Sequence, residues 1–93
     1  MSDSFKIFET DQFLKDLRHL NIKENDSKYQ KIKRYVYPQL QLNPYYGKNI
    51  KKLQNWKPET WRYRIGNFRL FYIVDDLVKI ISIIAFEPRD KAY

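Results

Sequence analysis

The sequence WRYRIGNFRLFY, residues 61–72, alternates large apolar side chains with other residues on both sides of a Gly-Asn pair. A period of two predicts a β-strand with one buried face. Gly66-Asn67 is a signal for the two-residue turn of a β-hairpin, with glycine suited to the first turn position. A hairpin folded there has an apolar face made by Trp61, Tyr63, Ile65, Phe68, Leu70 and Tyr72. We therefore expect this face to pack on the core.

The other face of the predicted hairpin carries three arginines, Arg62, Arg64 and Arg69. The turn places Arg64 directly opposite Arg69, and like charges in opposite positions destabilise a pair of strands. Guanidinium groups, however, bind phosphate through paired hydrogen bonds, so this cluster suits a polyanionic ligand. The alternative interpretation is that the long side chains spread apart and only keep the sheet soluble.

Positive charge is concentrated around and before this hairpin. The net charge of the chain is +7, and residues 48–93 hold ten bases against five acids. Three of the bases are lysines that precede the hairpin, Lys48, Lys51 and Lys52. This distribution favours a nucleic acid or an acidic protein as the partner.

Length and composition restrict the class of protein. We expect residues 1–93 to form a single domain, and the hydrophobic content of 43% is sufficient for a modest core. The chain has no cysteine and one histidine, which excludes disulfides, thiolate metal sites and multi-histidine metal centres. The chain lacks a signal-like N-terminus and a membrane-length apolar run, so we expect a soluble, cytoplasmic protein.

The remaining segments predict an α+β domain. Residues 5–8 alternate as a short strand, and two amphipathic helices follow at about residues 10–20 and 27–40. Pro38 is expected to kink or end the second helix near Tyr37. Residues 78–86 are apolar at nearly every position, which predicts a central strand covered on both faces. We expect two helices packed on a small, mostly antiparallel sheet of four strands.

Several of these segments together resemble the RelE/ParE superfamily of toxins from type II toxin–antitoxin systems. The segments are GKNIKKL at 47–53, WRYRIGNFRLFYIVDD at 61–76, the apolar strand that follows, and PRDKAY at 88–93. The resemblance extends over almost the whole chain and is strongest to RelE-type messenger-RNA interferases. It implies a RelE-like fold and an endoribonuclease that cuts messenger RNA on the translating ribosome without a metal or cofactor. It also implies growth arrest through inhibited translation, and an acidic antitoxin protein as partner.

The resemblance implies site residues at both ends of the second half. The basic residues of the family's hairpin fall on Arg62, Arg64 and Arg69, and its C-terminal arginine and tyrosine fall on Arg89 and Tyr93. Glu87 or Arg89 could occupy the functional position near the end of the last strand. Metal-free cleavage also needs a general base and a general acid. The candidates are Lys51, Lys52, Glu87 and Tyr93, and the lysines Lys48, Lys51 and Lys52 are candidate RNA contacts.

Two other functions remain open from the sequence. ParE-type relatives have the same fold but poison DNA gyrase by protein contact and cleave no RNA. A basic domain of this kind could also bind RNA or an acidic partner without catalysis.

Overall fold

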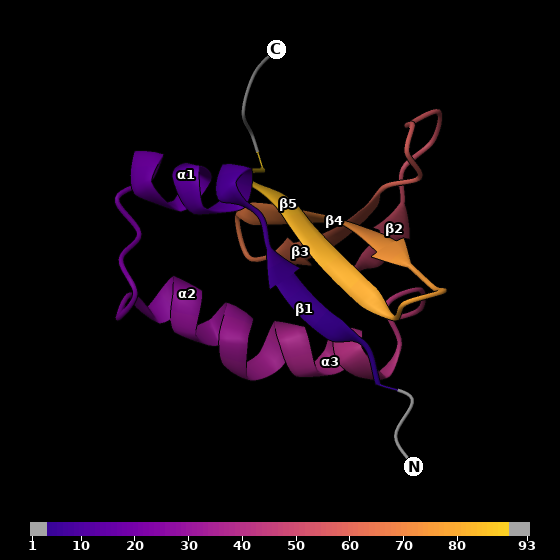
Figure 1. The fold of residues 1–93 in the computed structure, drawn as a ribbon. Coiled ribbons are helices and arrows are strands. Elements are labelled where there is room, and N and C mark those ends of the chain that lie inside the picture. The colour runs from indigo at the N-terminus through magenta and orange to yellow at the C-terminus, as the bar shows by residue number, and fades with distance from the viewer. Residues whose placement is uncertain (1–3, 90–93) are drawn as a thin grey trace.

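The computed structural model describes residues 4–89, which form two helical arms packed against one side of a sheet (Figure 1). The strands are β1 (Lys6–Glu9), β2 (Ile50–Lys52), β3 (Trp61–Ile65), β4 (Phe68–Asp75) and β5 (Ile80–Pro88). The helical segments are α1 (Asp11–His19), α2 (Ser27–Lys31), the π-helical turn η1 (Ile32–Val36) and α3 (Tyr37–Leu42). Helix α1 is the first helical arm, and the continuous segment of α2, η1 and α3 is the second. The predicted α+β class is confirmed.

The sheet has five strands in the order β1-β5-β4-β3-β2, not the four that the sequence predicted. β1 pairs parallel to β5, and every other pair is antiparallel. The additional strand is β2, whose three residues carry no alternating pattern of their own. It becomes a strand because it pairs with β3, placing Ile50 opposite Tyr63.

The predicted register of the central hairpin is confirmed. Ile65 pairs with Phe68, Tyr63 with Leu70, and Arg64 lies opposite Arg69. Gly66 sits in the turn with a φ of 54°, a conformation that glycine adopts without steric cost. The hairpin therefore separates an apolar face from an arginine-bearing face.

A β-bulge in β5 breaks the alternation of the last strand. Phe71 of β4 pairs with Ala85, but the next residue, Tyr72, pairs with Ile83, so Ile84 is the extra residue. The bulge keeps Ile83 and Phe86 in the core although they are three residues apart. β5 is an interior strand, between β1 and β4, but the prediction that it is covered on both faces is wrong, because its other face is only half-buried and Val78 is exposed before the strand begins. The helices cover one face of the sheet only.

Side-chain hydrogen bonds attach α1 to β5. The Thr10 hydroxyl accepts from the backbone N–H of Phe13 at 3.3 Å, as an N-cap does, and donates to the carbonyl of Ile83 at 2.7 Å. Asp16 Oδ2 accepts from the backbone N–H of Phe86 at 2.9 Å. Helix α1 thereby holds the strand on both sides of the bulge.

The second helical arm continues through Pro38, so the helix does not end near Tyr37, which was one of the two expected outcomes. The N–H of Tyr37 donates to the carbonyl of Ile32, five residues earlier, which is the hydrogen bond of a π-turn. A wider turn makes room for a proline ring that has no N–H to donate. The helix then runs to Leu42. No helix in residues 4–89 combines the length and apolar character needed to span a membrane.

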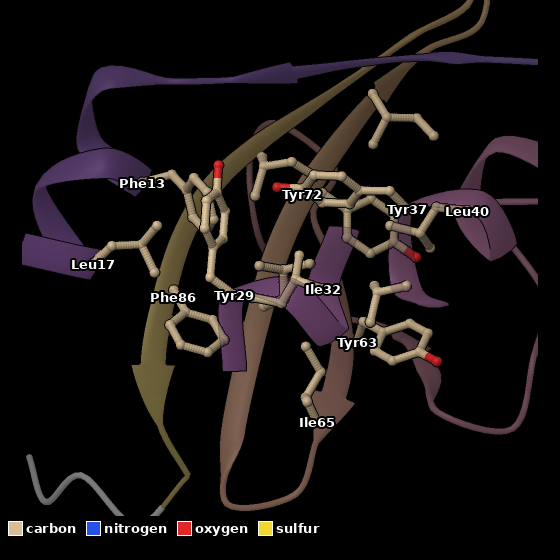
Figure 2. Close-up of a cluster of buried hydrophobic side chains, with 14 of the residues drawn as sticks. Phe13, Leu17, Tyr29, Ile32, Tyr37, Leu40, Tyr63, Ile65, Tyr72 and Phe86 are labelled. Carbon is tan, nitrogen blue, oxygen red and sulfur yellow. The ribbon is translucent and has the colours of Figure 1, made fainter. Parts of the chain in front are cut away.

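The core lies between the two helical arms and the sheet (Figure 2). Phe13, Ile32 and Leu40 from the helices are fully buried against Leu70 and Tyr72 from β4. The Tyr72 hydroxyl donates to the carbonyl of Pro44 at 2.6 Å. Burial raises the pKa of Tyr72, because the charged phenolate would lose its hydration.

Glu9 joins β1 to the second helical arm. Its carboxylate accepts hydrogen bonds from the hydroxyls of Tyr29, at 2.8 Å, and Tyr37, at 2.7 Å. Burial and then the Glu9 carboxylate raise the pKa of Tyr37, because both disfavour the phenolate. These hydrogen bonds fix the edge strand against the helices.

Candidate nucleic-acid interface

The side of the sheet that faces away from the helices brings the predicted arginines together in two neighbouring rows. One row across the strands contains Lys51, Arg62, Phe71 and Ala85. The next contains Arg64, Arg69 and Glu87. Rows on one face of a strand are about 7 Å apart. We call this surface the arginine face and define it by Lys51, Arg62, Arg64, Arg69, Phe71 and Glu87.

Arg62 lies in a cationic and partly desolvated position. Burial lowers the pKa of its guanidinium, and the charges of Arg64 and Arg69 lower it further. The Nε atoms of Arg62 and Arg69 are buried and have no hydrogen-bond partner among residues 4–89. A buried unpaired donor costs about 1–3 kcal/mol, so this arrangement needs an explanation beyond packing. An anion on the arginine face would relieve the repulsion and offer acceptors to guanidinium groups that move slightly.

Arg69 is held by neighbours on two sides. Its Nη2 lies 4.0 Å from Glu87 Oε1 on β5, and both side chains are 25% exposed. Its Cζ lies 5.7 Å from the centre of the Phe71 ring, within cation–π range. Glu87 therefore lies on the arginine face beside Arg69. The sequence had not decided between Glu87 and Arg89 for the functional position near the end of the last strand.

The three candidate lysines have different environments. Lys51 pairs with Arg62 and lies on the arginine face. Lys52 is the next residue along the strand, so its side chain points to the other face, and its Nζ contacts Glu59 Oε2 at 2.7 Å. Lys48 is exposed in the turn before β2. The structure thus brings one of the three into the row of Arg62.

Arg64 and Arg89 lie toward the end of the sheet near the hairpin turn. Arg64 is exposed and lines a hollow of about 230 Å³ that also contains Lys31 and Tyr35 of the second helical arm. The backbone N–H of Arg89 donates to the carbonyl of Asn67 in the hairpin turn, and its side chain is exposed. Tyr93, the other predicted C-terminal residue, lies outside the described residues.

The structure adds an aromatic element that the sequence reasoning missed. Trp56, from the loop between β2 and β3, stacks on Phe71 with ring centres 6.0 Å apart and planes 13° from parallel. A hollow of about 500 Å³ lies there, lined by Leu53, Trp56, Arg69, Phe71, Ile84, Ala85 and Glu87. The sequence feature that could have indicated this aromatic element is Phe71, an aromatic residue on the same face of β4 as Arg69.

Other parts of the described chain offer less for anion chemistry. A hollow of about 600 Å³ lies on the helical layer, lined by Leu14, Leu17, Arg18, Asn21, Ile22, Lys23, Glu24 and Tyr29. The histidine, His19, is exposed in the last turn of α1. Among residues 4–89, no three His, Asp or Glu side chains form a group that could hold a metal ion. The arginine face therefore remains the candidate site.

This arrangement can hold a strand of phosphates and stabilise extra negative charge on one of them. Guanidinium donors fixed in a sheet need little reorganisation when charge develops. Lys51 and Glu87 place a potential proton donor and a potential acceptor on the same surface. The surface thus combines an electrostatic element with groups that can transfer protons.

Comparison with solved structures identifies the fold. The RelE protein in the archaeal RelE–RelB complex from Pyrococcus horikoshii OT3 matches with a TM-score of 0.73 and 23% identity over 96% of this chain and 99% of that chain. The RelBE2 toxin–antitoxin complex from Mycobacterium tuberculosis matches with a TM-score of 0.73 and 21% identity over 92% and 99%. The isolated E. coli RelE toxin matches with a TM-score of 0.70 and 19% identity over 96% and 88%.

Comparison of the sequence identifies the family. The search of curated protein sequences gives no match. The model of a family described as the ParE toxin of type II toxin–antitoxin system, parDE, matches residues 7–93. Together with the RelE-like fold, this match confirms the resemblance seen in the hairpin and C-terminal segments. The chain belongs to the ParE toxin family, within the RelE/ParE superfamily of type II toxin–antitoxin toxins.

Proposed function

We propose that this toxin is an endoribonuclease that cleaves messenger RNA on the translating ribosome, without a metal, and so arrests growth. The observation that carries the proposal is the arginine face, where Arg62, Arg64 and Arg69 stand in two adjacent rows on a rigid sheet. Arg64 and Arg69 face each other there although like charges weaken a strand pair. The phosphates of a polyanionic substrate would offset the repulsion between these two arginines.

The proposed reaction uses the 2′-hydroxyl of the RNA as the nucleophile. A general base takes the 2′ proton, and the 2′ oxygen attacks the adjacent phosphorus. The bond from phosphorus to the 5′ oxygen breaks, and a general acid protonates the leaving oxygen. The products are a 2′,3′-cyclic phosphate and a 5′-hydroxyl end. The five-coordinate transition state carries extra negative charge, which fixed cationic donors stabilise.

We assign charge stabilisation to the arginines of the arginine face. Arg62 and Arg69 are partly buried, and contacts with Phe71 and Glu87 keep Arg69 in place. Arg64 is exposed and suits contact with a neighbouring phosphate. Arg89, beside the hairpin turn, is placed to bind the backbone further along the strand.

Lys51 and Glu87 are the proton-transfer candidates that lie on the arginine face. Lys51 stands next to Arg62, and Glu87 stands next to Arg69. Lys52, on the other face, and the exposed Lys48 are assigned to RNA contacts outside the reacting centre. Tyr93 remains a candidate for the general acid or for stacking on a base, and lies outside the described residues.

An acidic antitoxin is the proposed protein partner. The structures that match include toxin–antitoxin complexes, RelE–RelB and RelBE2. The net charge of +7 calls for a partner with complementary charge, and a segment that folds on binding can cover a large surface. Co-expression with the gene next to this one should restore growth and co-purify the two proteins. A harmless chain that retains no partner would contradict this assignment.

Primer extension on messenger RNA during translation tests the enzymatic proposal. We expect new 5′ ends within codons when the toxin is induced, and fewer or none in the Arg69→Ala variant. Intact messenger RNA in cells that nevertheless stop growing would contradict the proposal.

A second candidate function is inhibition of DNA gyrase by protein contact. It is favoured by the family model, which describes ParE toxins. A supercoiling assay with purified gyrase separates the two functions. Loss of supercoiling with intact messenger RNA would select the gyrase target, and cleaved messenger RNA with normal supercoiling would select the ribonuclease.

A further inference from the structure

We propose that Trp56 and the hollow beside it form a nucleobase-stacking site, which takes one unpaired base of the RNA strand bound along the arginine face. This inference rests on the proposed function and specifies how the site holds its substrate. It assigns a role in positioning the substrate to Trp56, which is not part of the arginine face.

The first observation is the exposure of Trp56. The indole stacks on the ring of Phe71, a residue that is only 7% exposed, yet Trp56 remains 51% exposed. A tryptophan that merely covered the sheet would bury most of its surface, because the gain from burial is proportional to area. Here the buried ring supports a second ring that presents its surface to the solvent.

The second observation is where this ring lies. Arg69 and Glu87 line the same hollow of about 500 Å³, and Arg69 also contacts the Phe71 ring. Volumes of about 300–1,000 Å³ are typical of sites for small organic groups. A base entering the hollow would meet an aromatic surface, while the phosphates on either side stay near guanidinium groups.

The third observation concerns how the loop is fixed. The N–H of Leu53 donates to the carbonyl of Thr60 at 2.9 Å, which closes the loop at its base. The Thr60 hydroxyl donates to the carbonyl of Pro58 at 2.8 Å, and Lys52 pairs with Glu59 beside it. Asn55 has a φ of 62°, so the chain reverses direction just before Trp56. The loop therefore presents the indole at a defined place over β4.

These features select an unpaired base as the occupant. Proteins that bind single-stranded nucleic acids combine a cationic track for the backbone with aromatic side chains on which bases stack. Both elements are within one surface here. A base in a duplex has its faces covered by neighbours, so the site would favour single-stranded RNA.

The test uses the fluorescence of Trp56 itself. The Trp61→Phe variant leaves Trp56 as the single tryptophan, since the chain contains two. Titration with a short single-stranded RNA, made with 2′-O-methyl groups so that it resists cleavage, should quench this fluorescence. An oligonucleotide of the same length that lacks bases should bind by charge and leave the fluorescence unchanged.

Affinity measurements give the matched comparison. Stacking contributes about 1–3 kcal/mol per base, so Trp56→Ala should weaken binding of the base-containing RNA by about 5- to 150-fold. Trp56→Phe should retain most of the affinity, and Trp56→Ala should bind the abasic oligonucleotide as the wild type does. Phe8→Ala, at an exposed aromatic residue on the far edge strand, is the control and should have no effect.

The outcomes separate this inference from the proposed function. Quenching by RNA together with a selective loss in Trp56→Ala supports the stacking site. RNA binding or cleavage that is unaffected by Trp56→Ala, or an equal loss for the abasic oligonucleotide, overturns the stacking site alone. A wild-type protein that neither binds nor cleaves RNA overturns both.

Discussion

Arg64 on β3 and Arg69 on β4 lie directly opposite each other, and Glu87 lies opposite Arg69 on the other side. The row therefore crosses three strands and holds two guanidinium groups and one carboxylate, which lies beside Arg69. Because like charges in opposite positions weaken a strand pair, the fold gains little from this row. Under the proposed function, an anionic ligand accounts for the row better than its contribution to stability does.

The first prediction concerns Arg69. Arg69→Ala should reduce the rate of messenger-RNA cleavage by about 10²–10³-fold, the usual effect of removing one fixed donor from a developing charge. The melting temperature of the variant should stay close to that of the wild type. The substitution removes the contacts of Arg69 with Glu87 and Phe71, but it also removes the repulsion between Arg69 and Arg64. Primer extension and thermal melting measure the two effects. Lys15→Ala, an exposed cation on α1, is the control for loss of charge.

The second prediction compares two adjacent lysines. Lys51→Ala should slow cleavage much more than Lys52→Ala, because Lys51 lies beside Arg62 whereas Lys52 pairs with Glu59 on the other face. If Lys51 transfers the proton, the loss in rate should be about 10²–10⁴-fold. Single-turnover cleavage rates of both variants decide the matter. Equal losses, or a larger loss in Lys52→Ala, would place the reacting centre elsewhere.

The third prediction concerns salt. Lys51, Arg62, Arg64 and Arg69 provide four cations on the arginine face, so log K for single-stranded RNA should fall with log salt with a slope of about −3 from these four, and more steeply if Lys48, Lys52 and Arg89 also bind phosphates. Arg64→Ala should reduce the magnitude of this slope by about 0.7, because one phosphate contact is lost. Fluorescence titrations at several salt concentrations give the slopes. A slope near zero would mean that the arginine face does not bind phosphates.

The fourth prediction concerns the attachment of α1 to β5. Asp16→Ala removes the acceptor of the Phe86 N–H and should lower the free energy of unfolding by about 1–3 kcal/mol. Asp16→Asn keeps a side-chain oxygen and should lose less. Urea denaturation compares the two variants. Since Glu87 follows Phe86, Asp16→Ala should also slow cleavage more than its stability loss alone explains.

The fifth prediction concerns alkaline pH. The pKa values of Tyr37 and Tyr72 are raised above about 10 in the folded state, chiefly by burial, so the unfolded chain releases these protons first. Stability should be unchanged below pH 10 and should fall above it by about 1.4 kcal/mol per pH unit for each tyrosine. Denaturation at pH 7 to 11 measures the decline. Tyr72→Phe should make it shallower, and Tyr35→Phe, exposed on η1, should not.

The hairpin and its arginine-bearing face could be predicted because both depend on local information. A period of two and a Gly-Asn turn fix which residues oppose one another, and the structure confirms Arg64 opposite Arg69. The amphipathic first helix was predicted from spacing in the same way, and Phe13 and Leu17 on it are buried.

Other features depend on partners far along the chain and could not be predicted. β2 is three residues long and exists through its pairing with β3. The parallel direction of β1 beside β5 is set by packing and by the crossover through the helices, which no residue within β1 encodes. Trp56 was missed because its position over Phe71 depends on the path of a whole loop. The continuation of the helix through Pro38 was not predicted, because the π-turn that accommodates this proline has no clear local sequence signal.

The extra residue in β5 lets the strand bury Ile83 and Phe86 and still point Glu87 outward, which a regular strand could not do. With strict alternation, a chain that buries Ile83 would also turn Glu87 inward and Phe86 outward. The bulge at Ile84 resets the count, so the core and the arginine face each receive the side chain that suits them. Bulges also increase the local bend and twist of a strand. The bend of the arginine face therefore depends in part on Ile84, a residue that neither fills the core nor carries charge, and relatives could change that bend by gaining or losing such a residue.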